Sequence, residues 1–137
     1  MDRYPWDPAL ETGNERIDTQ HKDLFQLANA LEACVRDDAC RDVVGDAVFR
    51  LVDHVVEHFR DEEALMIACH YPDLETHRTE HKTLAEQTIA FTVHTLEGDA
   101  PRVAELALVV SSWLREHILD FDRRLAEYLR DCDAAKQ

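Results

Sequence analysis

The stretch Val44–Met66, VGDAVFRLVDHVVEHFRDEEALM, carries a helical repeat of apolar residues that is interrupted by polar ones. Its apolar residues recur mainly at steps of three and four, the spacing that places side chains on one face of an α-helix. They are Val44, Ala47, Val48, Leu51, Val55, Phe59, Leu65 and Met66. His58 and Glu62 fall on the same face one turn apart, so they can reach a common centre. The stretch predicts a helix over about residues 41–67 that brings polar groups into a core.

Three other segments show the same amphipathic pattern. We expect helices over about 18–37, 72–93 and 101–130, after an N-terminal extended arm over about 1–17. His21 lies on the first of these stripes, His77 and His81 on the second, and His117 on the third. Four helices with short connections have one economical packing, an antiparallel up-down-up-down four-helix bundle. The sequence therefore predicts an all-α fold in a single domain over residues 1–137.

The overall composition narrows the class of protein. A chain of 137 residues is about one ordinary domain. Its 29 acidic against 15 basic residues give a formal net charge of -14, which would repel a phosphate backbone, so nucleic acid is not an expected partner. There is no apolar signal region at the start and no apolar run of about 20 residues, so we expect no membrane association and a cytoplasmic protein.

The cysteines are too few and too far apart to indicate a scaffold. They are Cys34, Cys40, Cys69 and Cys132, and no pair has the CxxC spacing of a metal or redox motif. A cytoplasmic protein keeps such thiols reduced. We therefore expect reduced cysteines that pack in the core or lie on the surface.

The polar residues on the inward faces indicate a metal site. They are His21, His58, Glu62, His77, His81 and His117. Burying so many polar groups without partners would cost several kcal/mol in all, roughly 1–3 for each. A single inward histidine is more often a hydrogen-bonded core residue, but five of them on four helices favour metal binding. We expect His54, His70 and His94, which lie off this pattern, to be surface or supporting residues.

The donor types indicate which metal the site would hold. These candidate ligands outnumber the four that one tetrahedral zinc takes. Their mixture of imidazole and carboxylate, without thiolate, suits two iron ions bridged by carboxylates, although manganese could bind to similar ligands. A ferritin-like di-iron site would use Glu-x-x-His motifs, and this chain contains none.

The motifs around these residues resemble those of the hemerythrin family. Glu11–Lys22 looks like the beginning of the first helix of bacterial hemerythrins. His58–Glu63, then Tyr71–His77 with His81, then Trp113–Ile118 with Asp122 are similar to the remaining family motifs, in order. The resemblance implies a four-helix bundle with two iron ions, cycling between Fe2+ and Fe3+, joined by a bridging oxo or hydroxo group.

Carried over by position, the resemblance implies a complete ligand set. It consists of His21, His58, Glu62, His77, His81, His117 and Asp122. The last three histidines would hold one iron and the first two the other, while the carboxylates would bridge them. Dioxygen would attach to the iron held by the first two histidines. Three apolar residues beside the ligands are expected to line the oxygen pocket and exclude water, namely Phe59, Trp113 and Leu114.

Asp122 is the one ligand that a regular helix does not favour. It lies five residues after His117, about 140° around a helix, whereas Asp120 lies only about 60° away. The helical wheel alone would select Asp120. The resemblance implies Asp122, and the two agree if a π-bulge lies between His117 and Asp122.

The function implied by the resemblance is reversible dioxygen binding for storage, delivery or buffering, without enzymatic turnover. One alternative is a di-iron enzyme that acts on peroxide, nitric oxide or oxygen, which would need a proton donor and a route for electrons. A second alternative is an oxygen or redox sensor that changes its contact with a redox or signalling protein partner.

Overall fold

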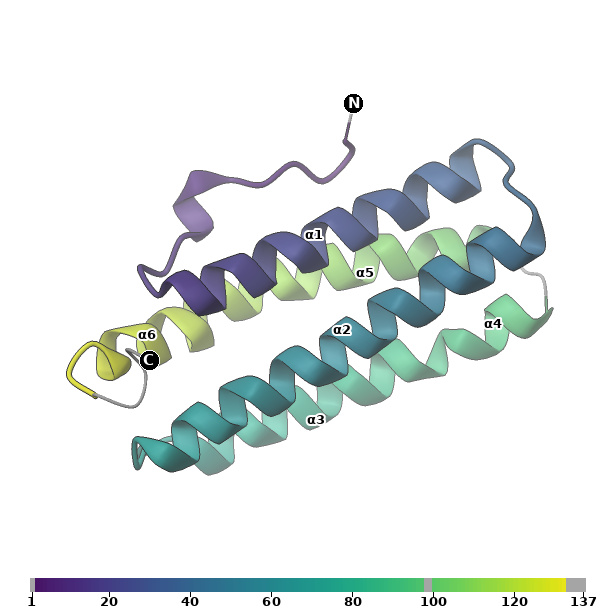
Figure 1. Cartoon of the computed structure of the whole chain (residues 1–137). Helices are drawn as coiled ribbons and strands as arrows, with labels where there is room; N and C mark the ends of the chain where they lie inside the picture. The colour runs from purple at the N-terminus through teal and green to yellow at the C-terminus, as the bar shows by residue number, and fades with distance from the viewer. Residues whose placement is uncertain (1, 98–99, 133–137) are drawn as a thin grey trace.

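The computed structural model describes residues 2–97 and 100–132, and within them the secondary structure is entirely helical. Four antiparallel rods lie side by side (Figure 1). The rods are α1 (Glu15–Arg36), α2 (Arg41–Ala68), α3 (Leu74–Ala90) continued by α4 (Thr92–Glu97), and α5 (Ala100–His117) continued by a π-helical turn (Ile118–Asp122) and α6 (Arg123–Leu129). The predicted all-α four-helix bundle is confirmed.

Local hydrogen bonds account for where the helices differ from the sequence prediction. The first helix begins at Glu15 rather than near residue 18, because the Asn14 side chain caps it by accepting the Ile17 amide at 3.0 Å. The third rod is interrupted at Phe91, whose amide donates to the Thr88 carbonyl three residues back.

The apolar core consists of two clusters with a polar layer between them. The larger cluster includes Leu24 and Phe59, and the smaller one, near the C-terminal end of the chain, includes Ile17 and Leu65. His21 lies between Ile17 and Leu24 on α1, and Glu62 lies between Phe59 and Leu65 on α2. The apolar residues on either side therefore seal this polar layer from solvent.

An extended N-terminal arm crosses the outside of the bundle along α1 (Figure 1). The Asn29 side chain fixes it by accepting the Tyr4 amide at 2.7 Å and donating to the Tyr4 carbonyl at 2.8 Å. Trp6 packs edge-on against Phe25, with ring centroids 5.5 Å apart. The arm therefore covers part of the core.

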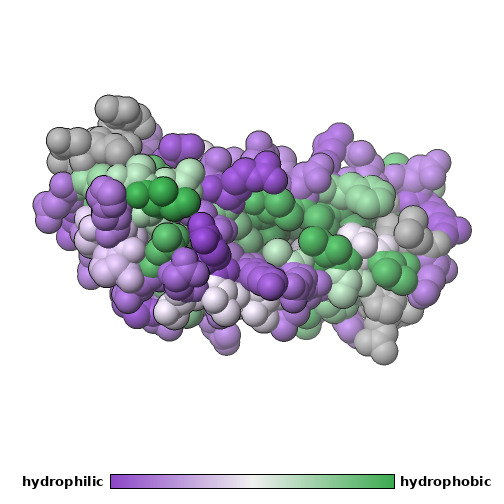
Figure 2. Space-filling view, turned by 90° about the horizontal axis from the view of Figure 1, so that it is seen from below, coloured by the Kyte–Doolittle hydropathy of each residue, from purple (hydrophilic) through white to green (hydrophobic). Residues whose placement is uncertain are grey.

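The opposite side of the bundle is formed by α2 and α3. Viewed from below, apolar residues gather there in a broken stripe between hydrophilic ones (Figure 2). In the described part of the chain, no helix is both long and apolar enough to cross a lipid bilayer.

The expectation of reduced cysteines is wrong for two of the four. Cys69 and Cys132 form a disulfide, with their Cα atoms 5.9 Å apart, although 63 positions separate them in sequence. The antiparallel topology brings the end of α2 beside the end of α6, which no spacing motif reveals. Cys34 and Cys40 are free.

Candidate metal centre

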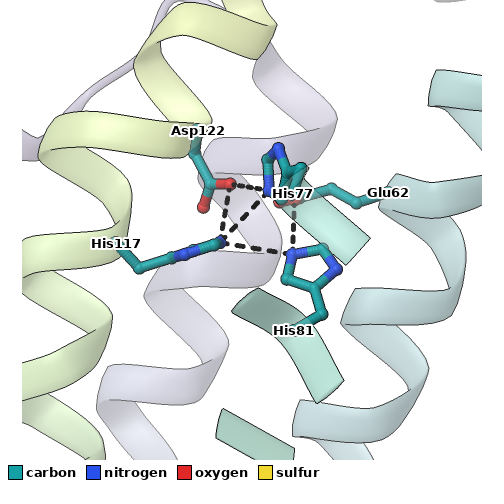
Figure 3. A group of neighbouring side chains, drawn as sticks. All are labelled: Glu62, His77, His81, His117 and Asp122. Atoms are coloured by element: carbon teal, nitrogen blue, oxygen red, sulfur yellow. Dashed lines mark hydrogen bonds and ion pairs between the residues drawn. The ribbon is translucent and has the colours of Figure 1, made fainter. Parts of the chain in front are cut away.

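All seven predicted ligands meet in the polar layer of the bundle, and each is at most 2% exposed. Every rod contributes. The residues are His21 of α1, His58 and Glu62 of α2, His77 and His81 of α3, His117 at the end of α5, and Asp122 at the end of the π-helical turn. Five of them are drawn in Figure 3.

Their donor atoms form two groups that share both carboxylates. One group contains His77, His81 and His117 with Glu62 and Asp122; the other contains His21 and His58 with the same two acids. Within each group the donor atoms all lie within 4.8 Å of one another. The geometry therefore suits two cations joined by two bridging carboxylates.

The two oxygens of each carboxylate face different groups. Glu62 Oε1 lies 3.1 Å from His77 Nε2 and 3.2 Å from His81 Nε2, while its Oε2 lies 2.9 Å from His58 Nε2. Asp122 Oδ1 lies 3.1 Å from the Nε2 atoms of His77 and His117, while its Oδ2 lies 2.8 Å from His21 Nε2. Each acid can thus give one oxygen to each cation.

The spacing of the histidine nitrogens also fits coordination. His117 Nε2 lies 3.3 Å from His77 Nε2 and 3.2 Å from His81 Nε2. Two ligand atoms each about 2.1 Å from a metal and at right angles to each other are about 3 Å apart. A shared proton could join one nitrogen pair, but three convergent ring nitrogens are better explained by a common cation.

Several buried donor atoms lack a hydrogen-bond partner of acceptable geometry. They include both oxygens of Glu62 and of Asp122, and Nε2 of His21 and of His58. Their close nitrogen–oxygen distances bring the atoms together without aligning an N–H on a lone pair. Unsatisfied buried polar atoms are costly, and metal ions would satisfy this set, so these residues fit the metals that the resemblance implies.

Without a metal, the site binds protons instead. Burial opposes the charged form of His21 and His77, but contacts with Asp122 and Glu62 outweigh it and raise the pKa of each histidine to about 9. Burial alone would raise the pKa of Glu62, but the charge of His58 and the close contacts with neighbouring histidine nitrogens hold that pKa well below its usual value. The pKa of Asp122 is also lowered, because His117 and His21 outweigh burial and repulsion from Glu62.

The π-helical turn resolves the choice between the two aspartates of the last rod. Ile118–Asp122 is wound as a π-helix, which confirms the predicted bulge and turns Asp122 into the site, where it is fully buried. Asp120 is exposed and forms a 3.1 Å ion pair with Arg124. The structure therefore places Asp122, and not Asp120, among the donors.

Two supporting residues were missed by sequence reasoning. Gln20 Oε1 lies 2.7 Å from His58 Nδ1, and the Gln20 amide nitrogen donates to Asp61 at 2.8 Å. Glu63 Oε2 lies 3.2 Å from His81 Nδ1. Such partners orient a ligating imidazole and increase its basicity. The only signal in the sequence is that Gln20 and Glu63 directly adjoin predicted ligands.

The residues expected to line an oxygen pocket are all buried, and one of them, Phe59, contacts a donor residue directly. Phe59 stacks on His81 with ring centroids 4.0 Å apart, and its ring centroid lies 5.8 Å from that of Trp113. Leu114 is fully buried. Phe59 and His81 also line a groove of about 600 Å³ between α2 and α3, so this stacked pair forms the boundary between the groove and the interior of the bundle.

Two of the three remaining histidines, His54 and His70, lie outside the donor groups. His54 is exposed and its Nδ1 lies 3.0 Å from the Arg50 carbonyl oxygen. His70 is an exposed residue with a left-handed backbone, φ 54°, just after α2. The side chain of His94 lies outside the described residues.

Comparisons with known proteins agree with this site. Residues 12–129 match the family model of the hemerythrin HHE cation binding domain. A bacteriohemerythrin from Clostridium acetobutylicum is 27% identical over 124 residues, which cover 88% of this chain and 96% of that protein. A myohemerythrin from Theromyzon tessulatum is 30% identical over 120 residues, which cover 87% of this chain and 88% of that protein.

Solved structures show the same likeness in three dimensions. The crystal structure of wild-type hemerythrin superimposes with a TM-score of 0.82 at 28% identity, covering 91% of this chain and 96% of that one. The match to the family model extends over most of the chain and includes every residue of the two donor groups. The chain belongs to the hemerythrin family.

Proposed function

We propose that this protein binds dioxygen reversibly at a di-iron centre. The observation that carries the proposal is the unequal division of donors. Five residues surround one position and four surround the other, with two carboxylates common to both. A metal at the four-residue position, beside His21 and His58, would have one protein donor fewer than a metal at the other position and so one more place for an external ligand. Two iron ions held here would supply the two electrons that dioxygen takes up and returns.

The protein residues contribute orientation and exclusion of water. Glu62 and Asp122 set the spacing of the two metal positions, because each presents one oxygen to each group. The buried apolar clusters on either side keep solvent from the donors. A dry pocket of this kind favours release of dioxygen over irreversible oxidation. We propose Phe59, Trp113 and Leu114 as the residues that maintain it.

The proposal is tested by an optical spectrum of the iron-loaded, anaerobically reduced protein before and after admission of oxygen. Metal content is determined on the same sample. We expect about two irons per chain, as the two donor groups require, and a visible charge-transfer band that disappears when oxygen is removed. One-way conversion to a stable ferric form would overturn oxygen carriage in favour of an enzyme or sensor acting on oxygen, peroxide or nitric oxide.

A matched pair of variants on α2 makes the test specific. His58 is 2% exposed within the four-residue group, whereas His54, one turn earlier, is exposed and outside both groups. His58→Ala should abolish the reversible band, and His54→Ala should preserve it. Equal loss in both variants would contradict the assignment of the oxygen-binding position.

A further inference from the structure

The disulfide closes one end of the bundle. Cys69 caps the C-terminus of α2, and Cys132 follows α6, with its amide donating to the Leu129 carbonyl at 3.0 Å. The linked segments also carry the two shared carboxylates, since Glu62 lies on α2 and Asp122 directly precedes α6. The crosslink therefore joins the two chain segments on which both proposed bridges depend.

Besides the disulfide, α6 is held by a short apolar seam, by Tyr128, and by Arg123, which donates to the Ala9 carbonyl of the N-terminal arm. It has only 7 residues, and its buried side chains are Leu125, Ala126 and Leu129. Leu125 and Leu129 belong to the smaller core cluster, together with Cys69. The Tyr128 hydroxyl donates to the Cys69 carbonyl at 2.7 Å. A 7-residue helix at the end of a rod is the kind of segment that opens locally without global unfolding.

The disulfide is accessible from one side. Cys69 is 6% exposed, whereas Cys132 is only half-buried. An attacking thiolate would therefore reach the Cys132 sulfur first. In the reducing cytoplasm that the sequence predicts, disulfides are uncommon, and those present are usually transient or redox-sensing.

We propose that Cys69–Cys132 is a reversible redox site for a dithiol reductant, and that its reduction frees α6 and loosens Asp122. A thiolate of the reductant attacks the Cys132 sulfur, the S–S bond breaks, and Cys69 leaves as a thiolate that takes up a proton. The second thiol of the reductant then resolves the mixed disulfide. In sum, the protein gains two electrons and two protons, and the reductant becomes a disulfide.

Reduction of the disulfide favours the open state of α6 because it increases the conformational entropy of the opened segment. While the disulfide is intact, an opened segment after Asp122 remains a closed loop tied to α2, so it gains less freedom than a free tail. Reduction removes that restriction and increases the open population by roughly tenfold or more. The effect on the metals rests on the proposed role of Asp122 as a bridge, whereas the redox site itself does not.

The test compares oxidised protein with protein reduced by dithiothreitol, using the full chain. Alkylation followed by peptide mass measurement reports the state of Cys69 and Cys132. Amide hydrogen exchange is followed on the metal-free protein, and iron release to a chelator on the loaded protein. We expect at least about tenfold faster exchange over residues 123–131, little change in the middle of α1 and α2, and faster iron release.

Two variants provide controls. Cys132→Ser should reproduce the reduced state without reductant, and Cys40→Ser, at an exposed free cysteine, should behave as the wild type. Unchanged exchange after reduction, or faster exchange in all helices, would overturn the proposal of local release. Faster exchange over 123–131 with unchanged iron release would overturn the coupling to Asp122 and leave oxygen binding untouched.

Discussion

Gln20 holds His58 in the tautomer that directs Nε2 toward the metal site. The Gln20 amide nitrogen donates to Asp61 at 2.8 Å, so the amide oxygen must face His58 Nδ1, 2.7 Å away. An oxygen there accepts a hydrogen bond from the Nδ1–H group, so the proton stays on Nδ1 and the Nε2 lone pair is free. The orientation of the His58 ring thus depends on the Asp61 carboxylate, to which it is connected through two hydrogen bonds by way of Gln20.

Replacing Gln20 should therefore weaken one metal position selectively. In Gln20→Leu, His58 loses its acceptor, and we expect affinity at the His21 and His58 position to fall roughly 10- to 100-fold, the usual cost of such a partner. The position held by three histidines should retain its metal. Stepwise iron titration measures both. Gln26→Leu, at an exposed position of the same helix, is the control, and equal weakening in both variants would contradict the prediction.

The two aspartates of the last rod provide a second test. Asp122 is fully buried among the donors, whereas Asp120 is exposed beside Arg124. Asp122→Asn should reduce iron content below two per chain, since it weakens a donor common to both groups. Asp120→Asn should leave loading unchanged and alter the unfolding free energy by no more than about 1 kcal/mol. Full loading of the Asp122 variant would disprove its role as a bridge.

The helical periodicity was sufficient to predict the bundle and to place five histidines and Glu62 on inward faces. It was insufficient for Asp122, because a regular helix directs that residue away from His117. The resemblance supplied the residue, and the π-helical turn supplies the physical reason. A local change of winding leaves no trace in a pattern with a period of 3.6 residues.

Contacts between residues on different rods could not be predicted from the sequence either. Glu63 adjoins Glu62, yet its contact with His81 depends on which helix packs beside α2. The pairing of Cys69 with Cys132 depends on the same topology, across 63 positions. To predict either contact, one must know how far two neighbouring helices are shifted along their axes, to within one helical turn. The periodicity of a single helix does not define that shift.

The metal-free protein should have a pH-dependent stability of defined sign. The pKa of His21 and of His77 rises from 6.5 to about 9 on folding. Their contribution to the unfolding free energy is therefore complete below about pH 6.5 and is lost as the pH rises through about 9. Glu62 has a lowered pKa, so its contribution is present above its usual pKa and is lost in acid.

Urea unfolding of the metal-free protein at about pH 6 and about pH 9 measures this effect, and we expect the lower stability at the higher pH. Metal binding requires neutral imidazoles, so loading should release protons and the apparent affinity should rise over the same range. Proton release can be followed with an indicator dye. Constant stability across this range would show that the histidines do not hold protons in the metal-free site.

Phe59 should control both stability and the lifetime of the oxygenated form. Its ring is 3% exposed and stacks on His81, and the two residues line the groove between α2 and α3. Phe59→Ala removes a buried aromatic side chain and should cost about 3–5 kcal/mol of unfolding free energy. It also opens a path for water from the groove, so the oxygenated protein should autoxidise faster.

A second substitution at Phe59 separates the loss of stability from the faster autoxidation. Phe59→Leu keeps most of the apolar volume and should retain more stability, but it leaves the face of His81 less covered. Its autoxidation rate, measured as decay of the visible band, should lie between those of the wild type and Phe59→Ala. Phe49→Ala, at a half-exposed phenylalanine of the same helix, should change neither quantity appreciably. If Phe59→Ala binds oxygen as durably as the wild type, other residues must exclude water from the site.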